Sequence, residues 1–196
     1  MRYRTDLTAG SLKVPESRVI AGLLLQDLDD AGWRKALFDE NVLQTRSPMT
    51  AKRLRTLLQN RLEPMGPALW RLVRDGSALV ASHACLAAAI RRSALLGDFL
   101  DLVVREQIRA FAPALSPRLW EDYIEDCRGR DPEMPEWSPS TIERLRSSVF
   151  QILEQAGYVE NTRTLKLQNV HIAREVLDLL RDQDQRYVLR CIQVTL

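Results

Sequence analysis

A serine followed at once by a proline begins three amphipathic stretches of this chain: Ser47-Pro48, Ser116-Pro117 and Ser138-Pro139. A serine side chain at the N-cap accepts a hydrogen bond from a free backbone amide of the first helical turn. Proline suits the first helical position because it lacks the N–H group that would have no partner there. These signals predict a fold built from helices with sharply defined starts.

The apolar residues support this prediction, because leucine and alanine dominate them and only 6% of the chain is aromatic. Both are among the stronger helix formers. Apolar positions repeat with a helical period between the proline and glycine breaks. We expect about nine helices, over residues 15–28, 31–41, 48–62, 67–75, 78–96, 98–111, 117–127, 139–156 and 171–183. The predicted fold class is therefore mostly all-α.

One helix break is expected at Gly97. It places Asp98 and Asp101 in the first turn of the helix that follows. Negative side chains stabilise a helix there because they face the positive end of its dipole.

A second break covers residues 128–140, which contain three prolines. It is either a linker between a helical domain at 1–130 and a smaller domain at 138–196, or an ordered loop pinned by Trp137. The sequence leaves both alternatives open.

The helical period is lost after Gly157. Residues 158–160 and 164–167 surround an Asn-Thr-Arg turn, which predicts a small β-hairpin. Residues 187–196 are β-prone and predict a final strand. A helix that runs into a hairpin is typical of a winged helix, so the C-terminal part is expected to be winged-helix-like.

The three cysteines are far apart in the sequence, which is unlike a disulfide framework and suits a reducing compartment. The longest apolar stretch, residues 79–90, is too short and too polar to span a bilayer. We therefore expect a cytoplasmic protein without a membrane partner.

The largest local excess of charge lies between Arg46 and Arg74, although the whole chain is close to neutral at +2. Seven basic residues occur there against one acid, Glu63. They are Arg46, Lys52, Arg53, Arg55, Arg61, Arg71 and Arg74. A local positive field attracts anionic partners such as nucleic acid.

The predicted helix at 48–62 places leucines on one arc and polar residues on the other. Lysine and arginine neutralise phosphates, and arginine, glutamine and asparagine also hydrogen-bond base edges. A helix precedes it across a short turn, as in a helix-turn-helix motif. The alternative is a solvated polar face with no partner. The candidate DNA-binding residues here are Arg46, Lys52, Arg53, Arg55, Gln59 and Asn60.

A second candidate DNA-binding surface surrounds the helix at 139–156 and the predicted hairpin. Arg144 is expected to face outward, and Arg163 and Lys166 lie on the hairpin, which in winged helices often contacts phosphates. Arg146 falls near the apolar arc, so we expect it to be an internal salt-bridge or packing residue and not a contact to nucleic acid. The alternative is a small cap that completes the core.

Residues able to catalyse a reaction or hold a metal form no readable motif. His83 and Cys85 are two positions apart, so a helix directs them to opposite sides, which is poor metal geometry. No glycine-rich phosphate loop or activated nucleophile is apparent. An acidic cluster is expected to be a solvated face or a partner for the basic segments: Glu121, Asp122, Glu125 and Asp126. We expect no catalytic residue, no metal and no cofactor.

Five segments carry a resemblance to a known family. They are YRTDLTAGSL (3–12), PESRVIA (15–21), LLGDFLDLVVREQ (95–107), CRGRDPEMPEW (127–137) and AGYVENTRTLKL (156–167). They resemble the BrxA family, small accessory proteins of bacterial BREX phage-defence systems, from Tyr3 to about Ile192. The resemblance implies a NusB-like helical fold, no enzymatic activity and DNA binding through basic surfaces. It also implies work beside a DNA methyltransferase, a phosphatase-like protein and an ATPase.

Two functions follow from these observations. The first is a non-enzymatic adaptor that binds double-stranded DNA and supports host DNA methylation and phage defence. The second is a protein–protein scaffold whose charged patches dock other defence subunits. RNA binding, by analogy with NusB, rests on the fold alone.

Overall fold

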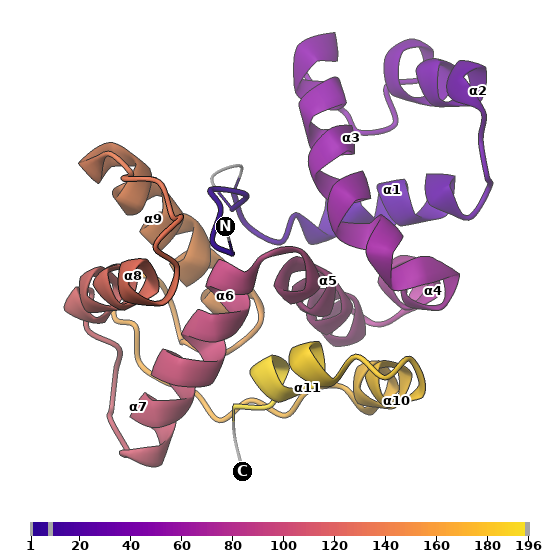
Figure 1. Ribbon diagram of the computed structural model, residues 1–196. Coiled ribbons are helices and arrows are strands. Elements are labelled where there is room, and N and C mark those ends of the chain that lie inside the picture. Colours follow the sequence, from indigo (N-terminus) through magenta and orange to yellow (C-terminus); the bar gives the residue numbers. More distant parts are fainter. Residues whose placement is uncertain (1, 8–9, 195–196) are drawn as a thin grey trace.

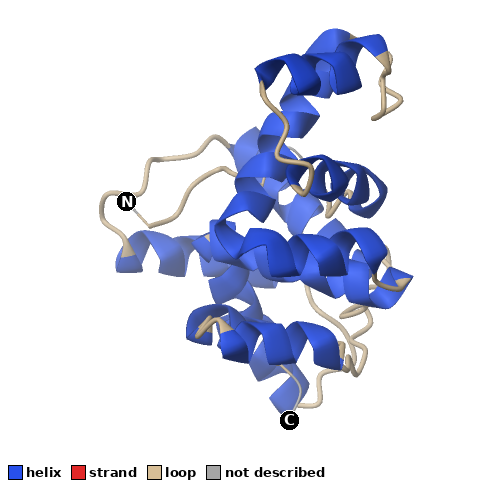
Figure 2. Ribbon diagram, turned by 90° about the vertical axis from the view of Figure 1, so that its right-hand side faces the viewer, coloured by secondary structure: helices blue, strands red, loops and turns tan. Residues whose placement is uncertain are grey.

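The computed structural model describes residues 2–7 and 10–194, and these form helices joined by loops. Figure 1 shows the order of the helices, and Figure 2 shows no strand among the residues drawn in colour. The α-helices are α1 (Val14–Leu24), α2 (Asp30–Arg34), α3 (Pro48–Leu62), α4 (Gly66–Asp75), α5 (Ala78–Arg92), α6 (Ala94–Asp98), α7 (Arg105–Arg109), α8 (Arg118–Arg130), α9 (Pro139–Gln155), α10 (Arg174–Asp182) and α11 (Arg186–Ile192). Two short elements are π-helical, η1 (Lys35–Asp39) and η3 (Phe99–Val104), and η2 (Glu63–Met65) is a 3₁₀-helix. The mostly helical prediction is confirmed.

Serine caps begin α3 and α9 as the Ser-Pro pairs predict, but α8 begins at Arg118 with Pro117, not Ser116, at its N-cap position. Ser47 accepts a hydrogen bond from the amide of Thr50 at 3.3 Å, and Ser138 accepts one from the amide of Thr141 at 3.3 Å. Ser77 caps α5 in the same way through the amide of Val80. Each bond involves residues three positions apart, so these starts are decided locally.

The predicted break at Gly97 is wrong. The chain bends at Ser93, whose backbone is extended, and a helix then continues from α6 through η3 and α7 to Arg109. Gly97 lies inside this helix, and the ring of Tyr187 packs against it. The Tyr187 Cζ is only 2.9 Å from the position a Cβ would occupy, so a larger residue does not fit there without a shift of the ring. Asp98 and Asp101 are consequently interior residues of the long helix, and the first-turn role expected for them is also wrong.

Helix α5 lies at the centre of the molecule (Figure 1). Every residue from Val80 to Ile90 is buried, and the helix packs against α1, α3 and α4 on one side and against α10 and α11 on another. Alanines dominate this stretch, and their small side chains allow close approach from several directions. A helix that is apolar on all sides is a core helix.

A second part of the core is aromatic. The Phe99 ring meets the rings of Trp120 and Tyr123 edge to face, with centroids 5.2 Å apart in both pairs. Phe150 of α9 lies 6.4 Å from Phe99. These contacts hold α8 and α9 against η3, since edge-to-face pairs stabilise beyond the area they bury.

The described parts of the N-terminal segment, residues 2–7 and 10–12, lie between two groups of helices, one with α1 to α4 and the other with α6 to α9 (Figure 1). Its Leu12 amide donates to the Gln155 side chain of α9 at 2.8 Å. The carbonyls of Gly10 and Ser11 accept hydrogen bonds from Arg61 of α3. Because Tyr3, Leu7 and Leu12 are buried, this segment is part of the core.

The segment at 128–140 is ordered and contributes buried side chains. Met134 and Trp137 are both buried, and Trp137 pins the loop as the second alternative describes. The core is one continuous cluster with residues from both sides of this loop, and α10 and α11 pack on α4 and α5. The division into domains at 1–130 and 138–196 stays a prediction.

The predicted hairpin is not formed. Residue pairs Val159–Leu167 and Ala114–Lys166 form isolated antiparallel bridges, and neither extends into a strand. Leu165 adopts a left-handed backbone with φ of 50°, which interrupts any extended run. The Leu165 carbonyl accepts a hydrogen bond from the Leu115 amide. Residues 165–167 therefore pair partly with the segment at 114–115 and partly with Val159.

The final strand predicted over residues 187–196 is wrong for most of its length, because residues 186–192 form α11. Residues 195 and 196 lie outside the described residues. Val188, Cys191 and Ile192 are buried and lie on the face that packs against α5. Their spacing of three and four positions matches a helix. Packing against α5 therefore outweighs the strand preference of Tyr187, Val188 and Ile192.

Within 2–7 and 10–194, no single helix is long and apolar enough to cross a membrane. Helix α5 and the following helix reach that length and apolarity only as a pair, and they are bent by 109° at the break.

Candidate nucleic-acid interface

Helix α3 separates its apolar and polar residues as its sequence predicts. Leu58 and Leu62 are buried, while Leu54 and Leu57 are half-buried against the core. On the opposite side, Lys52, Arg53 and Asn60 are exposed. The helix thus presents polar side chains along most of its length.

The exposed cations of this surface lack acidic neighbours. Arg46, Lys52 and Arg53 form no ion pair with any residue in the described parts of the chain. Thr56, one turn after Lys52, returns its hydroxyl to the Lys52 carbonyl at 3.0 Å. The positive charge here is therefore available to an external anion, and we call Arg46, Lys52, Arg53 and Asn60 the α3 surface.

Arg55 and Gln59 lie differently, because both are half-buried. The Arg55 guanidinium stacks over the Trp33 ring at 4.2 Å from its centroid, and its Nε donates to Gln59 Oε1 at 3.0 Å. Gln59 in turn donates to Glu63 Oε1 at 2.6 Å. These contacts tie α3 to α2 beside a pocket of about 530 Å³, lined in part by Trp33, Gln59 and Glu63.

Two further members of the basic stretch are not free surface charges. Arg61 is buried and bonds to the N-terminal segment, and burial lowers the pKa of its guanidinium. Arg74 forms a bidentate pair with Asp75 at 2.7 and 2.8 Å. The charge that sequence counting assigns to this stretch is therefore only partly presented to solvent.

The connection before α3 is longer than expected. Helix η1 ends at Asp39 and α3 begins at Pro48, so residues 40–47 form the turn. A helix-turn-helix motif commonly uses three or four residues. The helix-turn-helix assignment is not confirmed by this geometry.

The second candidate surface presents fewer free charges. Arg144 and Arg163 are exposed, but Lys166 pairs with Glu160 at 3.8 Å. Arg163 also lines a small pocket of about 270 Å³ between α9 and the turn at 161–165. Figure 1 shows α3 and α9 on either side of the N-terminal segment, so the two candidate surfaces belong to different groups of helices.

Arg146 forms an internal salt bridge, as its position near the apolar arc predicts. Its guanidinium pairs with Glu143 at 2.7 Å and with Glu121 at 3.7 Å. Glu121 comes from the acidic cluster of α8, all four of whose acids are exposed. Asp122 pairs with Arg118 of the same helix at 3.9 Å. The cluster therefore meets basic partners within the chain at Glu121 and Asp122, and the carboxylates of Glu125 and Asp126 stay solvated.

The comparisons with known proteins agree with one another. The BrxA family profile matches residues 1–184. The chain belongs to the BrxA family. The BREX protein BrxA of Paramagnetospirillum magneticum is 54% identical over 195 residues, which cover 100% of this chain and 98% of the relative. The BREX protein BrxA of Escherichia coli O9:H4 is 34% identical over 91% of this chain and 85% of its own.

A crystal structure of an uncharacterized protein from Magnetospirillum magneticum has the same fold as this BrxA-family chain. The TM-score is 0.93 with 52% sequence identity, and the match covers 100% of both chains. The resemblance found in the sequence segments is thus confirmed across the whole chain.

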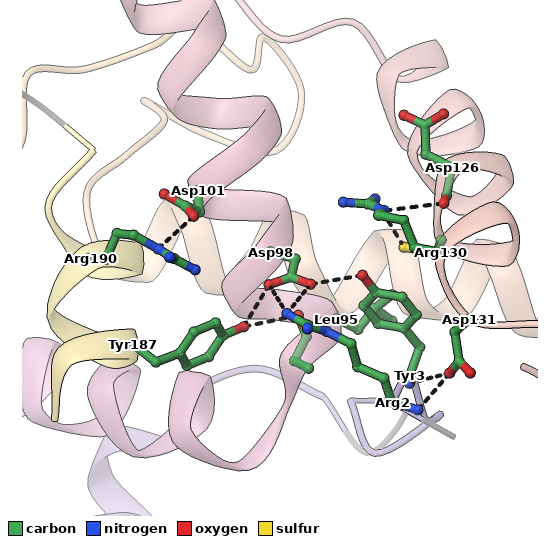
Figure 3. Close-up of polar contacts among 12 residues, drawn as sticks. Arg2, Tyr3, Leu95, Asp98, Asp101, Asp126, Arg130, Asp131, Tyr187 and Arg190 are labelled. Carbon is green, nitrogen blue, oxygen red and sulfur yellow. Dashed lines mark hydrogen bonds and ion pairs between the residues drawn. The ribbon is translucent and has the colours of Figure 1, made fainter.

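Three of the segments that resemble BrxA meet in a polar cluster that the sequence did not predict (Figure 3). Asp98 of α6 is buried and accepts hydrogen bonds from the hydroxyls of Tyr3 and Tyr187, each at 2.8 Å. Arg2 pairs with the same carboxylate at 2.8 Å. Asp131 accepts the Tyr3 amide at 3.1 Å. These residues fasten the N-terminal segment to α6, α8 and α11.

Two ion pairs of Asp101 lie beside this cluster. Asp101 binds Arg105 at 2.9 Å on its own helix and Arg190 of α11 at 2.9 Å. Asp98 and Asp101 thus accept from donors on α11, and Asp131 accepts from the N-terminal segment. The cluster therefore positions elements of the BrxA fold, and the spacing of single residues in sequence carries no signal for it.

The three thiol groups of this BrxA-family chain are buried, and so is the imidazole of His83, while His171 is exposed. Burial raises the pKa of Cys85 to about 11 and that of Cys191 to about 12. His83 is buried, its Nδ1 accepts the Ala173 amide at 3.0 Å, and burial lowers its pKa. Among the described residues no group of three or more His, Cys, Asp or Glu side chains is placed to hold a metal ion. These thiols and the His83 imidazole thus belong to the core.

Proposed function

We propose that this protein is a non-enzymatic DNA-binding component of a BREX phage-exclusion system, where it supports host DNA methylation and phage defence. Family membership supports the BREX assignment, because two relatives that cover most of the chain are BREX proteins. The α3 surface carries the DNA-binding part. It presents Arg46, Lys52 and Arg53 without an acidic partner in the described chain.

The chemistry of the α3 surface matches a phosphate backbone. Lysine and arginine that neutralise phosphates release counterions, and this release drives binding without regard to sequence. Asn60, two turns after Arg53, adds an amide able to reach a base edge or a sugar. Binding here is expected to depend steeply on salt and weakly on sequence.

Arg55 and Gln59 take a supporting part in this proposal. Because Arg55 stacks on Trp33 and Gln59 bridges it to Glu63, their side chains hold α3 in place. Direct contact with DNA is assigned to the exposed residues Lys52 and Arg53 first. Arg144, Arg163 and Lys166 form a second, weaker grip, since Glu160 partly neutralises Lys166.

The test is fluorescence anisotropy with a duplex of about 25 base pairs at rising salt. The wild-type affinity is expected to fall with a slope of roughly −0.9 in log–log terms for each phosphate neutralised. Reversing two charges, Lys52→Glu with Arg53→Glu, is expected to abolish binding at moderate salt. Both side chains are exposed and unpaired in the described chain, so circular dichroism should show an intact fold.

The matched control is Arg109→Glu with Arg128→Glu, which makes the same change in net charge. Both arginines are exposed and lie in the last turns of α7 and α8. If the control loses affinity equally, long-range charge and not the α3 surface attracts DNA. If the wild type fails to bind duplex at low salt, the DNA-binding proposal is wrong.

A scaffold role is the second candidate, favoured by one observation. Phe111, after α7, is 93% exposed, and its backbone is left-handed with φ of 53°. An exposed aromatic held this way suits a contact with another protein, and the acidic cluster of α8 is available for basic partners. The partners would be the methyltransferase, the phosphatase-like protein or the ATPase of the system.

Pull-down from cells that carry the whole system separates the two roles. A scaffold predicts that Phe111→Ser loses a subunit while Lys52→Glu/Arg53→Glu retains all of them and still supports methylation. A DNA-binding adaptor predicts the reverse effect on methylation. RNA binding is tested by using single-stranded and duplex RNA as competitors in the anisotropy assay.

A further inference from the structure

A basic pocket lies outside both candidate DNA surfaces. It has a volume of about 360 Å³ and lies where the N-terminal segment, the end of α5 and α11 meet. The charged and polar side chains that line it are Arg2, Arg4, Asp6, Arg91, Arg92 and Tyr187. Four arginines thus face one hollow that contains a single carboxyl group.

The four arginines of this pocket differ in whether they form an ion pair within the chain. Arg2 pairs with Asp98, and Tyr187 donates to the same carboxylate, so this side of the pocket is fixed (Figure 3). Arg4, Arg91 and Arg92 are exposed and form no ion pair with a residue in 2–7 or 10–194. Three guanidinium groups are therefore free to bind an anion.

The one carboxyl group of the pocket compensates them poorly. Asp6 is half-buried, and burial raises the pKa of its carboxyl, although Ser93, Arg92 and Arg61 act in the opposite direction. Even when it is ionised, this carboxylate offsets only one of the three guanidinium groups that have no ion pair in the described chain. The pocket thus keeps a net positive charge.

Helix ends alone do not account for this arrangement. Basic residues in a last turn offset the negative end of the helix dipole, and Arg109 and Arg128 serve that purpose on α7 and α8. Arg91 and Arg92 occupy the same kind of position on α5. Unlike those two, they meet Arg4, from a distant part of the chain, across a hollow with a fixed tyrosine wall.

We propose that this pocket binds a phosphate group through Arg4, Arg91 and Arg92. The planar guanidinium presents paired N–H donors that match phosphate oxygens, and such charge-assisted bonds are the strong ones. Within the proposed function, which this part rests on, the phosphate belongs to the DNA backbone. A free phosphate compound has the same chemistry and is the other source.

The first arm of the test uses inorganic pyrophosphate alone, titrated into the full chain in a calorimeter. Saturable binding is expected. The variant Arg91→Gln/Arg92→Gln should weaken it about tenfold or more, the loss expected for one charge-assisted bond. The control Arg109→Gln/Arg128→Gln removes two arginines from equivalent last turns and should bind as the wild type does. Absent binding, or equal binding by both variants, overturns the proposal.

The second arm repeats the salt series with duplex DNA. If the DNA backbone is the source, Arg91→Gln/Arg92→Gln reduces the slope by about 0.9 for each phosphate lost and pyrophosphate competes with DNA. If only pyrophosphate binding is lost, the pocket serves a free phosphate compound. If the wild type binds pyrophosphate through these arginines but binds no DNA, the phosphate site is supported and the proposed DNA-binding function is wrong.

Discussion

Asp98→Ala is expected to be among the most damaging single substitutions in this protein. It removes the acceptor of the Tyr3 and Tyr187 hydroxyls and the partner of Arg2. Tyr3 is only 1% exposed, so its hydroxyl would stay buried without a partner, at a cost of about 1–3 kcal/mol. Tyr187 loses less because Ala94 offers a second acceptor at 3.4 Å. Arg2 is 53% exposed, which limits its share to about 1 kcal/mol or less.

Together these losses amount to about 3–4 kcal/mol in the free energy of unfolding. For a chain of this size that lowers Tm by roughly 10 °C. Asp98→Asn keeps one acceptor oxygen and should cost about half as much. Urea denaturation followed by circular dichroism measures both, with an unchanged m-value as the sign that the same transition is compared.

The control is Asp126→Ala on α8, an exposed acid whose carboxylate forms no hydrogen bond or ion pair with the described residues (Figure 3). It should change stability by less than about 0.5 kcal/mol. If Asp98→Ala lies within about 1 kcal/mol of the wild type, the buried cluster does not fasten the N-terminal segment and the reasoning is refuted.

Three further predictions follow from buried groups. Gly97→Ala places a Cβ against the Tyr187 hydroxyl and should cost about 1–3 kcal/mol by thermal melting; an unchanged Tm would show that the ring moves freely. Burial raises the pKa of Asp6 in the folded chain above its value in the unfolded chain. The ionised carboxylate therefore lowers the free energy of unfolding at pH values above the folded pKa, and this loss disappears as the pH falls below the unfolded pKa. Asp6→Asn should therefore raise Tm at pH 7, with the gain vanishing below about pH 3.9. The thiols of Cys85 and Cys191 should resist Ellman's reagent at pH 8 until urea unfolds the chain, and rapid reaction of the native protein would contradict their burial.

Helix starts were readable from sequence because their physics is local. Ser47, Ser77 and Ser138 each bond an amide three residues later, so a short window contains the whole signal. The polar arc of α3 was readable for the same reason, since helical periodicity decides which side chains oppose the leucines.

Residues whose partners come from distant segments were not readable. Arg61 counted as surface charge, yet it is buried against Gly10 and Ser11. Arg55 and Gln59 belong to the polar arc, but Trp33 of another helix covers Arg55. Asp98 looked like a helix start because Gly97 precedes it, whereas packing of Tyr187 explains that glycine.

The C-terminal segments show how packing overrides local preference. Residues 186–192 have strand-like composition but lie as a helix on α5, where their three-and-four spacing buries Val188, Cys191 and Ile192. The turn at 161–165 has the residues of a hairpin, but Leu165 adopts a left-handed backbone and pairs with Leu115.

The fastening of the N-terminal segment also has a consequence for synthesis on the ribosome. Tyr3 depends on Asp98 and Asp131, and Leu12 depends on Gln155, which is made 143 residues later. Loops this long close slowly, and chains expose apolar surface until they do. Within this fold, the apolar side chains of Tyr3, Leu7 and Leu12 are therefore made before the residues that cover them, and they stay exposed until the chain has been made as far as α9.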